Sequence, residues 1–446
     1  MFCHCHTIPI IPILTYYLFL HYQFLAMAFS VIRSNRTLVR PFEHTPSHTL
    51  NLSFIDKLPV LRCNARTLHV FRHHPEAADI IRQALSKALV PYYPLAGRLK
   101  ESEQCHQLQI ECSGEGVWFV EASANCTLDA VSYFDDTASI PYEDLLPPDK
   151  AAERGGVEPL VQMQVTKFEC GGYVMGLIFC HSICDGLGAA QFLTAVGELA
   201  RGLDHLTITP VWCRDFFPTP PQEPNFSAMP KLPPPLPNYR LQHANIDISL
   251  DQIKHLKQQF HNLTGKICSS FEIVAASFWR LRTQAMNFDQ NTEVKLVFFA
   301  NCRHLLDPPL PKGFYGNCFF PVTITWSSDY LMQSSVHDVV GLIQESKAKL
   351  AAEFFKFRRG EYGEDPFAPP LDYTTLFVSE WGRLGFNQVD YGSGAPVHFV
   401  PIQGSSVIPV GIVGSLPLPK KGIRLMTWCA EKKHLAPFTD LMMKLT

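Results

Sequence analysis

The stretch YVMGLIFCHSICDGLGAAQFLTAVGELARG, residues 173–202, decides the fold because it joins two kinds of element through one short loop. Residues 173–180 form an apolar run of strand length, which is typical of a strand buried on both faces. Residues 187–202 repeat apolar side chains at three- and four-residue intervals, which predicts a helix. The loop between them places an ionisable side chain, His181, where the buried strand ends. A buried strand followed at once by a helix predicts an α/β fold.

The chain length and one proline-rich segment predict two domains. The 446 residues exceed the size of one ordinary hydrophobic core. Ten prolines fall within residues 208–240, which predicts a crossover between domains at 27–207 and 241–446. Each half mixes strand and helix patterns. Charged residues make up only 18% of the chain and its formal net charge is −3, so nucleic acid is excluded as a main partner.

The sequence predicts the local structure of two further segments, a turn and a long helix. LQIEC (108–112) and VWFVEA (117–122) read as strands that SGEG (113–116) joins as a turn. The apolar repeat of SVHDVVGLIQESKAKLAAEFFKF (335–357) predicts one long helix.

Residues 1–26 form an N-terminal extension that we interpret as separate from the enzyme-like chain beginning at Met27. The segment is apolar, but no Lys or Arg precedes Arg33, so the basic region of a signal peptide is missing. Its CHCH cluster (3–6) is a weak metal motif without a distant partner pair, so no metal site is expected. The fourteen cysteines lack a repeated spacing and predict reduced thiols in a cytoplasmic protein.

Three interpretations of residues 181–186 compete on spacing alone. In the first, His181 is a general base, since imidazole exchanges a proton near neutral pH. In the second, the glycines that begin at Gly186 form a nucleotide-binding loop, but Gln191 stands where the third glycine belongs. In the third, His181 is structural and Asp185 caps the helix.

A cysteine nucleophile is a further alternative, because Cys180 and Cys184 flank His181. No G-x-S-x-G, H-E-x-x-H, phosphate-binding loop or paired C-x-x-C motif occurs in the chain. Serine hydrolase, zinc protease and phosphate-loop chemistry are therefore disfavoured.

The motif HSICDG resembles the H-x-x-x-D-G motif of the plant BAHD acyl-CoA-dependent acyltransferases. The resemblance runs in order from about Met27 to the C-terminus and is closest to the taxane and spermidine acyltransferase group. Further similar blocks are YYPLAGRLK (92–100), CSGEGVWFVEA (112–122), SSFEIVAASFWRLR (269–282), ANCRHLLDPPLPKGFYGN (300–317) and SEWGRLGFNQVDYGSGAP (379–396).

The resemblance implies a two-domain fold like that of chloramphenicol acetyltransferase, with mixed sheets, helices and an active-site channel between the domains. It implies a monomeric enzyme that moves an acyl group from a CoA thioester to a hydroxyl or amine of a small specialised metabolite. Acyl-CoA is then a co-substrate, and neither a bound cofactor nor an obligatory protein partner is implied. His181 is the general base, Asp185 supports the loop from the side away from the substrate, and Gly186 leaves room for the substrates.

The second family motif, D-F-G-W-G, reads DYGSG here. The resemblance implies a structural role for Asp390, Gly392 and Gly394, with Asp390 paired to Arg303. Ser393 replaces a tryptophan that reaches toward the reaction centre in some members, so this change is expected to widen the acceptor pocket or weaken catalysis. The alternative function is accordingly a catalytically weakened binding or regulatory protein.

The CoA site is less defined by the sequence. Ser269 and Ser270 precede a predicted helix, whose N-terminus favours phosphate groups. Simple N-capping explains the same two serines equally well. The clusters Arg358-Arg359 and Lys420-Lys421 are candidates for a local phosphate contact, and the acidic stretch EYGEDP (361–366) is either a wall for an amine acceptor or a surface loop.

Overall fold

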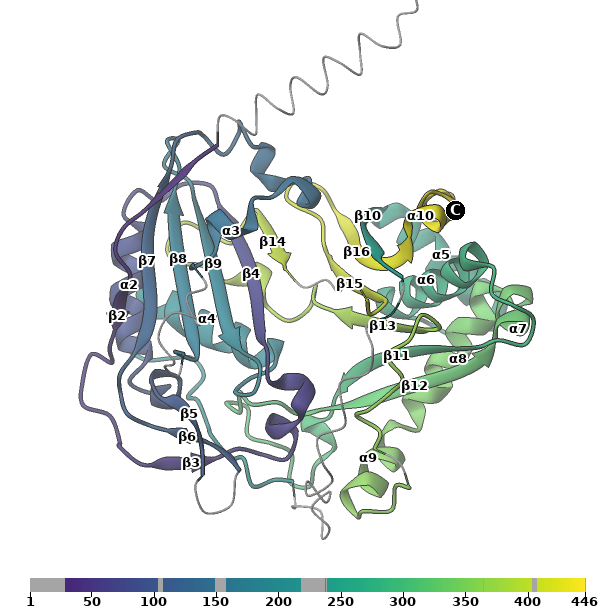
Figure 1. The fold of residues 1–446 in the computed structure, drawn as a ribbon, viewed down its shortest axis with the longest axis horizontal. Helices are drawn as coiled ribbons and strands as arrows, with labels where there is room; N and C mark the ends of the chain where they lie inside the picture. The colour runs from purple at the N-terminus through teal and green to yellow at the C-terminus, as the bar shows by residue number, and fades with distance from the viewer. Residues whose placement is uncertain are drawn as a thin grey trace, which may run out of the picture.

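The computed structural model describes residues 29–102, 107–148, 158–217, 237, 239–363, 365–402 and 407–445. Two mixed sheets lie side by side, one built mainly from each half of the chain, and a small third sheet lies beyond one end of the first (Figure 1). The predicted extension 1–26 and its CHCH cluster fall outside the described residues.

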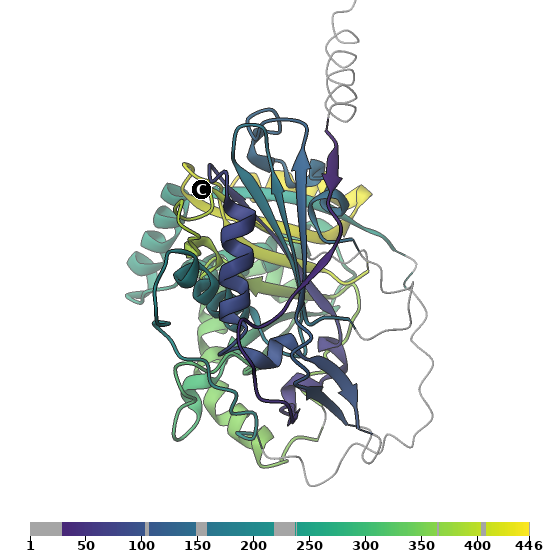
Figure 2. The same ribbon diagram turned by 90° about the vertical axis from the view of Figure 1, so that its left-hand side faces the viewer.

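The first sheet has the order β1-β7-β8-β9-β4-β14, with β2 also paired to β7, and the small sheet has the order β3-β6-β5. Its strands are β1 Val31–Arg33, β2 Thr37–Val39, β4 Asn64–Phe71, β7 Val117–Ala124, β8 Val161–Lys167, β9 Tyr173–Cys180 and β14 His398–Pro401, and the small sheet holds β3 Thr49–Asn51, β5 Arg98–Glu101 and β6 Leu108–Glu111. The helices of this half are α2 Ala77–Ala88, α3 Tyr142–Leu145 and α4 Gly186–Ala200. In Figure 2, α2 lies across the face of this sheet.

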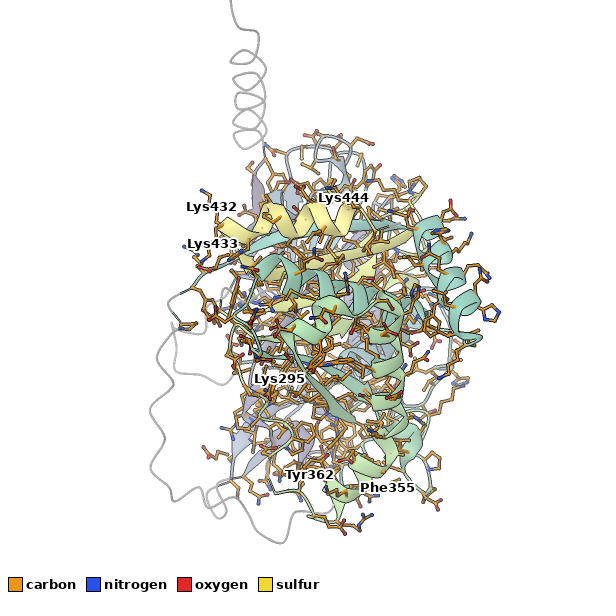
Figure 3. The ribbon with its side chains drawn as sticks, turned by 90° about the vertical axis from the view of Figure 1, so that its right-hand side faces the viewer. Lys295, Phe355, Tyr362, Lys432, Lys433 and Lys444 are labelled. Atoms are coloured by element: carbon orange, nitrogen blue, oxygen red, sulfur yellow. The ribbon has the colours of Figure 1, made fainter. Side chains whose placement is uncertain are left out.

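The second sheet has the order β10-β16-β15-β13-β11-β12. Its strands are β10 Leu241–Ser249, β11 Glu293–Asn301, β12 Phe319–Ser327, β13 Thr375–Glu380, β15 Val410–Ser415 and β16 Gly422–Glu431. The helices are α5 Leu250–Thr264, α6 Ser270–Met286, α7 Ser328–Gln333, α8 Val336–Ala348, α9 Leu350–Arg358 and α10 Lys432–Met443. Figure 3 faces the outer side of this half, with α10 and its lysines at one end and Phe355 and Tyr362 at the other.

The central prediction from residues 173–202 is confirmed. Every residue of β9 is buried, and α4 begins six residues after β9 ends. Buried side chains of α2, α4 and the first sheet form one hydrophobic core, and a second core lies under the second sheet. A third cluster joins residues of both halves, among them Ile55, Phe217 and Phe320.

Two predicted connections are wrong. Strand β6 pairs with β3 and β5, whereas β7 pairs with β1, β2 and β8, so SGEG carries the chain from one sheet to another. Both glycines of SGEG have positive φ, a backbone conformation that glycine adopts readily. They let the chain pass from the small sheet to the first sheet without forming a hairpin. The long helix predicted over 335–357 is two helices, α8 and α9, that meet at Lys349.

Two features of the fold cross the predicted division of the chain into halves. Strand β14, which follows position 241, pairs with β4 and so belongs to the first sheet. The described beginning of the crossover is packed into the protein, because Arg214 and Phe217 are buried and Val211 bridges to Phe314. Sequence composition shows the proline content of this segment but not its anchoring side chains.

Candidate active site

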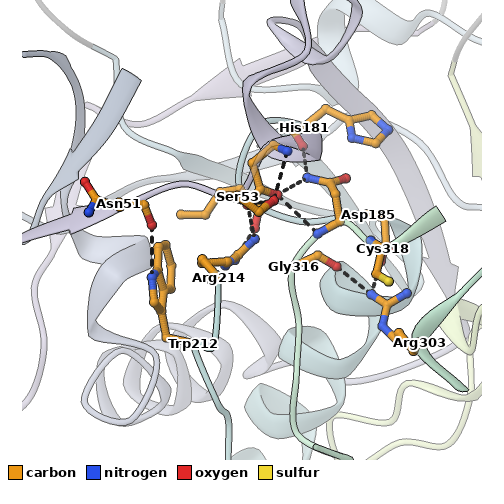
Figure 4. A network of polar contacts seen from close by, with 12 residues as sticks. Asn51, Ser53, His181, Asp185, Trp212, Arg214, Arg303, Gly316 and Cys318 are labelled. Carbon is orange, nitrogen blue, oxygen red and sulfur yellow. Dashed lines mark hydrogen bonds and ion pairs between the residues drawn. The ribbon is translucent and has the colours of Figure 1, made fainter. Parts of the chain in front are cut away.

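His181 lies directly after β9, at the edge of the first sheet. Strand β9 pairs with β4 up to Cys180 and Asn64, and the His181 backbone N–H then donates to the Cys63 carbonyl at 2.9 Å. The His181 carbonyl accepts a hydrogen bond from Asn317 Nδ2 at 2.8 Å. These two bonds hold the backbone from both halves of the chain, and the imidazole is partly exposed and extends away from the polar network (Figure 4).

The Asp185 carboxylate is occupied by protein donors. It caps α4 by accepting from the Gly188 N–H at 3.0 Å, and it accepts from Arg303 Nη2 at 2.8 Å. Its second oxygen accepts from the Cys318 N–H at 3.4 Å. Asp185 therefore connects the His181 loop and α4 to the second half of the chain.

The predicted pairing of Asp390 with Arg303 is wrong. Arg303 bonds Asp185 and the Gly316 carbonyl, whereas Asp390 lies beside Arg201 at the C-terminal end of α4. The sequence does not reveal which carboxylate Arg303 binds, because Asp185 and Asp390 are equally suitable partners for a guanidinium group.

The glycines after His181 serve close packing. A β-carbon on Gly188 would overlap the backbone carbonyl of Tyr315, and one on Gly186 would meet the side chain of Leu384. Leu384 therefore occupies the space beside Gly186. The first turn of α4 is capped by Asp185, so a phosphate would have to displace that carboxylate to bind there, which disfavours the nucleotide-loop interpretation.

The two cysteines beside His181 are poorly suited to nucleophilic attack. Burial raises the pKa of Cys180 to about 11, and burial together with the neighbouring Asp185 raises the pKa of Cys184 well above its ordinary value. Both thiols are therefore protonated at neutral pH, and the thiol is a far weaker nucleophile than the thiolate. The cysteine–histidine alternative is not supported.

A buried network that the sequence did not reveal lies behind the His181 loop. Asp56 has no exposed surface and forms an ion pair with Arg214 at 2.7 Å. Its carboxylate also accepts from the Ser53 hydroxyl at 2.7 Å and from Asn317 Nδ2 at 2.7 Å. Arg214 donates further to the Ile183 carbonyl at 2.7 Å, within the loop itself. The network connects both halves and the crossover to the residues around His181 (Figure 4).

The sequence contains only weak signals for this buried network. Asp56 and Lys57 are the two charges within the otherwise apolar stretch LSFIDKLPVL, and a carboxylate in such a stretch hints at a buried partner. Arg214 lies in the segment interpreted as a loose crossover, and Asn317 is an unremarkable polar residue in a loop. Their meeting depends on the tertiary fold.

The DYGSG motif lies far from His181. The Asp390 carboxylate accepts from the Gly392 and Gly394 N–H groups at 2.7 and 2.8 Å, and both glycines have positive φ. The Ser393 hydroxyl lies next to the side chain of Tyr173, the first residue of β9. There it opposes the rise in the pKa of Tyr173 that burial causes. His181 follows the other end, about 23 Å away at the rise of an extended strand.

This position overturns the expectation that Ser393 alters the reaction site. Helix α4 gives a second measure of the separation, since Asp185 is at its N-terminus and Arg201 with Asp390 at its C-terminus. Its fifteen residues span about 21 Å at the rise of an α-helix. A tryptophan in place of Ser393 would lie on the surface at that end.

Ser269 caps α6 in a reciprocal capping box with Glu272. The Ser269 hydroxyl accepts from the Glu272 N–H at 3.1 Å, and the Glu272 carboxylate accepts from the Ser269 N–H at 2.8 Å. Glu272 also pairs with Lys347, so the cap is tied to α8. The capping interpretation of Ser269 is thus realised, and Ser270 is the first residue of the helix.

Three of the four residues in the basic clusters considered for phosphate are engaged with protein groups. Lys420 pairs with Asp135 at 2.6 Å, and Arg359 pairs with Glu361 at 2.6 Å. Arg358 donates to the Phe216 carbonyl at 3.1 Å. Among the described residues, no three His, Cys, Asp or Glu side chains gather as metal ligands. In that same part of the chain, none of the helices has the length and apolar character that crossing a bilayer needs.

The chain is similar to a family of transferases over most of its length. The family model described as "Transferase family" matches residues 29–428. "Acyl transferase 4" of Oryza sativa subsp. japonica is 43% identical over 93% of this chain and 98% of its own length. A myricetin 3-O-glucosyl 1,2-rhamnoside 6'-O-caffeoyltransferase of Crocosmia x crocosmiiflora is 37% identical over 93% and 99%. A 3'-N-debenzoyl-2'-deoxytaxol N-benzoyltransferase of Taxus canadensis is 34% identical over 93% and 96%.

Solved structures share the fold at lower sequence identity. Vinorine synthase superimposes with a TM-score of 0.70 at 21% identity, covering 92% of this chain and 96% of its own. TRI101 of F. sporotrichioides, solved with coenzyme A and T-2, superimposes with a TM-score of 0.67 at 14% identity, covering 88% and 97%. The two-domain arrangement implied by the sequence resemblance is confirmed by these matches.

Proposed function

The chain belongs to the plant BAHD acyltransferase family, and from this premise we propose that it transfers an acyl group from CoA to a small-molecule acceptor with His181 as the general base. The observation that carries the assignment is the partly exposed His181 imidazole at the end of β9. The neighbouring Asp185 is engaged and both neighbouring thiols are protonated, so we assign the proton transfer to the His181 imidazole.

The proposed reaction needs no covalent acyl-enzyme. His181 takes the proton from an acceptor hydroxyl while the acceptor oxygen attacks the thioester carbonyl. The tetrahedral oxyanion then collapses, the C–S bond breaks, and the protonated imidazole returns a proton to the leaving CoA thiolate. Positioned general-base catalysis contributes about 10²–10⁴-fold, and holding both substrates together contributes much of the remainder.

We assign the other sequence-predicted residues to supporting roles. Asp185 and Arg303 hold the loop, and Asp390, Gly392 and Gly394 form a distant turn at the end of α4. For CoA we propose Ser270 at the N-terminus of α6, since Ser269 is committed to the cap.

We propose a hydroxyl acceptor as the first class to test and an amine as the second. The curated relatives include enzymes named for both O-acyl and N-acyl transfer. The carboxylate of Glu361, considered for an amine acceptor, is exposed and paired with Arg359, as expected of a surface loop. We place the enzyme in the cytoplasm, which fits the free cysteines of the described residues, and we propose that it acts as a monomer.

The second candidate, a binding protein with weakened chemistry, loses its supporting observation. That interpretation rested on Ser393, which lies at the opposite end of β9 from His181. The His181 loop and its supports are intact.

Free-thiol release from acetyl-, benzoyl- and p-coumaroyl-CoA tests the proposal. The purified chain from Met27 is assayed with a panel of alcohols and amines, beside His181→Ala and the surface control His205→Ala. Acceptor-dependent CoA release that His181→Ala abolishes and His205→Ala retains supports the assignment. Full turnover by a correctly folded His181→Ala protein would refute His181 as the base.

A further inference from the structure

Two buried polar atoms next to the His181 loop have no hydrogen-bond partner within the described part of the chain. They are His181 Nδ1 and Asn317 Oδ1. The two residues are already in contact, because Asn317 Nδ2 donates to the His181 backbone carbonyl at 2.8 Å. Asn317 has no exposed surface, so bulk water does not donate a hydrogen bond to its amide oxygen. An unpaired ring nitrogen and an unpaired amide oxygen therefore belong to neighbouring residues, and each costs free energy while it stays unpaired.

The orientation of the Asn317 amide is fixed by its surroundings. Its Nδ2 group donates to Asp56 Oδ1 at 2.7 Å and to the His181 carbonyl. Turning the amide over would set its oxygen against a carboxylate and a carbonyl, which repel it. Asp56 is itself held by the Arg214 guanidinium and the Ser53 hydroxyl. The amide oxygen therefore stays at the position that has no hydrogen-bond donor beside it among the described residues.

We propose that Asn317 is a positioning residue whose Oδ1 accepts the Nδ1–H of His181 and thereby fixes the imidazole tautomer. The inference rests on the proposed role of His181 as the base. In the proposed arrangement the imidazole rotates about its side-chain bonds until Nδ1 comes within hydrogen-bond reach of Asn317 Oδ1. A neutral imidazole carries its proton on one nitrogen only, so an Nδ1–H leaves Nε2 unprotonated and able to act as the base.

The proton balance follows from this arrangement. Nε2 takes the proton of the acceptor hydroxyl, and the resulting imidazolium keeps its Nδ1–H on the Asn317 oxygen. Nε2 then gives its proton to the CoA thiolate, which restores the starting tautomer. The orienting chain runs from Arg214 through Asp56 and Asn317 to His181, and it combines residues of the crossover and both halves of the chain.

Nitrogen-15 NMR of the unaltered protein tests the tautomer directly. The chain is labelled with 15N-histidine, and the His181 signals are identified by their absence in His181→Gln. At a pH where His181 is neutral, the expected spectrum shows a protonated Nδ1 and an unprotonated Nε2. A neutral His181 with its proton on Nε2 would overturn the proposal, and this measurement does not depend on the folding of an Asn317 variant.

Kinetics of Asn317→Ala supply the second test, with Asn245→Ala as the matched control. Asn245 bonds Thr137 across the two halves of the chain, outside the His181 network, and so controls for a weakened domain contact. For Asn317→Ala we expect kcat to fall by about 10²-fold, with KM for acyl-CoA changed less than about twofold, whereas Asn245→Ala retains kcat. A folded Asn317→Ala protein with unchanged kcat would overturn the proposal.

The experiments distinguish the general-base role of His181 from the positioning role of Asn317. Turnover that survives His181→Ala refutes the general base itself. Turnover that requires His181 in an enzyme whose neutral His181 carries its proton on Nε2 refutes only the role of Asn317.

Discussion

Arg303 Nη2 donates to Asp185 Oδ1 at 2.8 Å, and this bond joins the helix that follows His181 to the segment after β11. Both side chains are mostly buried, at 15% and 12% exposure. The same carboxylate caps α4, so one group sets the direction of the helix and its attachment to the second half. The position of His181 therefore depends on a contact made outside its own domain.

Replacing Arg303 by Leu is expected to reduce both stability and turnover. Removing one partner of a buried pair leaves an uncompensated charge, which costs about 3 kcal/mol of unfolding free energy. Displacement of the loop should also lower kcat by about 10²-fold. Urea unfolding and CoA-release kinetics measure the two effects.

A double-mutant cycle with Asp185→Leu separates the pair from general packing. The two substitutions should be non-additive, with a coupling of about 1–3 kcal/mol. Lys100→Met is the matched control, because Lys100 pairs with Glu111 on the exposed surface at 3.8 Å. Additive effects of Arg303→Leu and Asp185→Leu would contradict the structural role of the bond.

Restoring the family tryptophan by Ser393→Trp is expected to leave catalysis unchanged. Position 393 is exposed and lies at the start of β9, about 23 Å from His181 by the strand rise. We expect kcat and both KM values within about twofold of the parent protein, since the new side chain would lie at the opposite end of β9 from His181. Steady-state kinetics with one acyl-CoA and one acceptor decide the matter, and a tenfold gain in kcat would show that Ser393 had weakened the enzyme.

Replacing Cys184 by Ala should preserve turnover. Burial and Asp185 raise the pKa of this thiol well above its ordinary value, so it does not supply a thiolate. The variant should lose some stability because a buried group is removed, yet keep kcat within a few-fold. Mass spectrometry of the parent protein mixed with acyl-CoA should show no added acyl mass. A persistent acyl adduct that disappears in Cys184→Ala would instead establish a covalent route.

The sequence predicted the elements whose signal is local. Strand β9 and helix α4 were confirmed because an apolar run and a helical repeat depend on neighbouring residues alone. The capping role of Asp185 was among the interpretations for the same reason, since a cap needs only the helix that follows it.

Features that depend on pairing between distant segments were missed. SGEG has the composition of a hairpin turn, but its strands find partners in different sheets. Arg303 pairs with Asp185 and not with Asp390, although both carboxylates suit it chemically. The group formed by Asp56, Arg214 and Asn317 spans more than 250 positions, so its members carry no mutual signal within any short window.

Two buried histidines are expected to make the protein less stable in mild acid. Burial lowers the pKa of His69 to about 3, and burial followed by the nearby charge of Arg424 lowers that of His398 to about 4. Both are neutral in the folded protein at pH 5, whereas in the unfolded chain they titrate near 6.5. The unfolded chain then binds more protons between pH 6.5 and 4, so the free energy of unfolding falls as the pH falls through this window.

His398→Gln isolates one of the two contributions. Each histidine costs about 1.4 kcal/mol of stability per pH unit within the window. Between pH 7.5 and 5.0 the parent protein should therefore lose about 2 kcal/mol through His398, and the variant should lack that part of the loss while His69 maintains its own. Urea unfolding at the two pH values measures the difference, with the exposed His205→Gln as control. If His398→Gln loses as much stability on acidification as His205→Gln does, His398 is not held neutral by its burial in the folded protein.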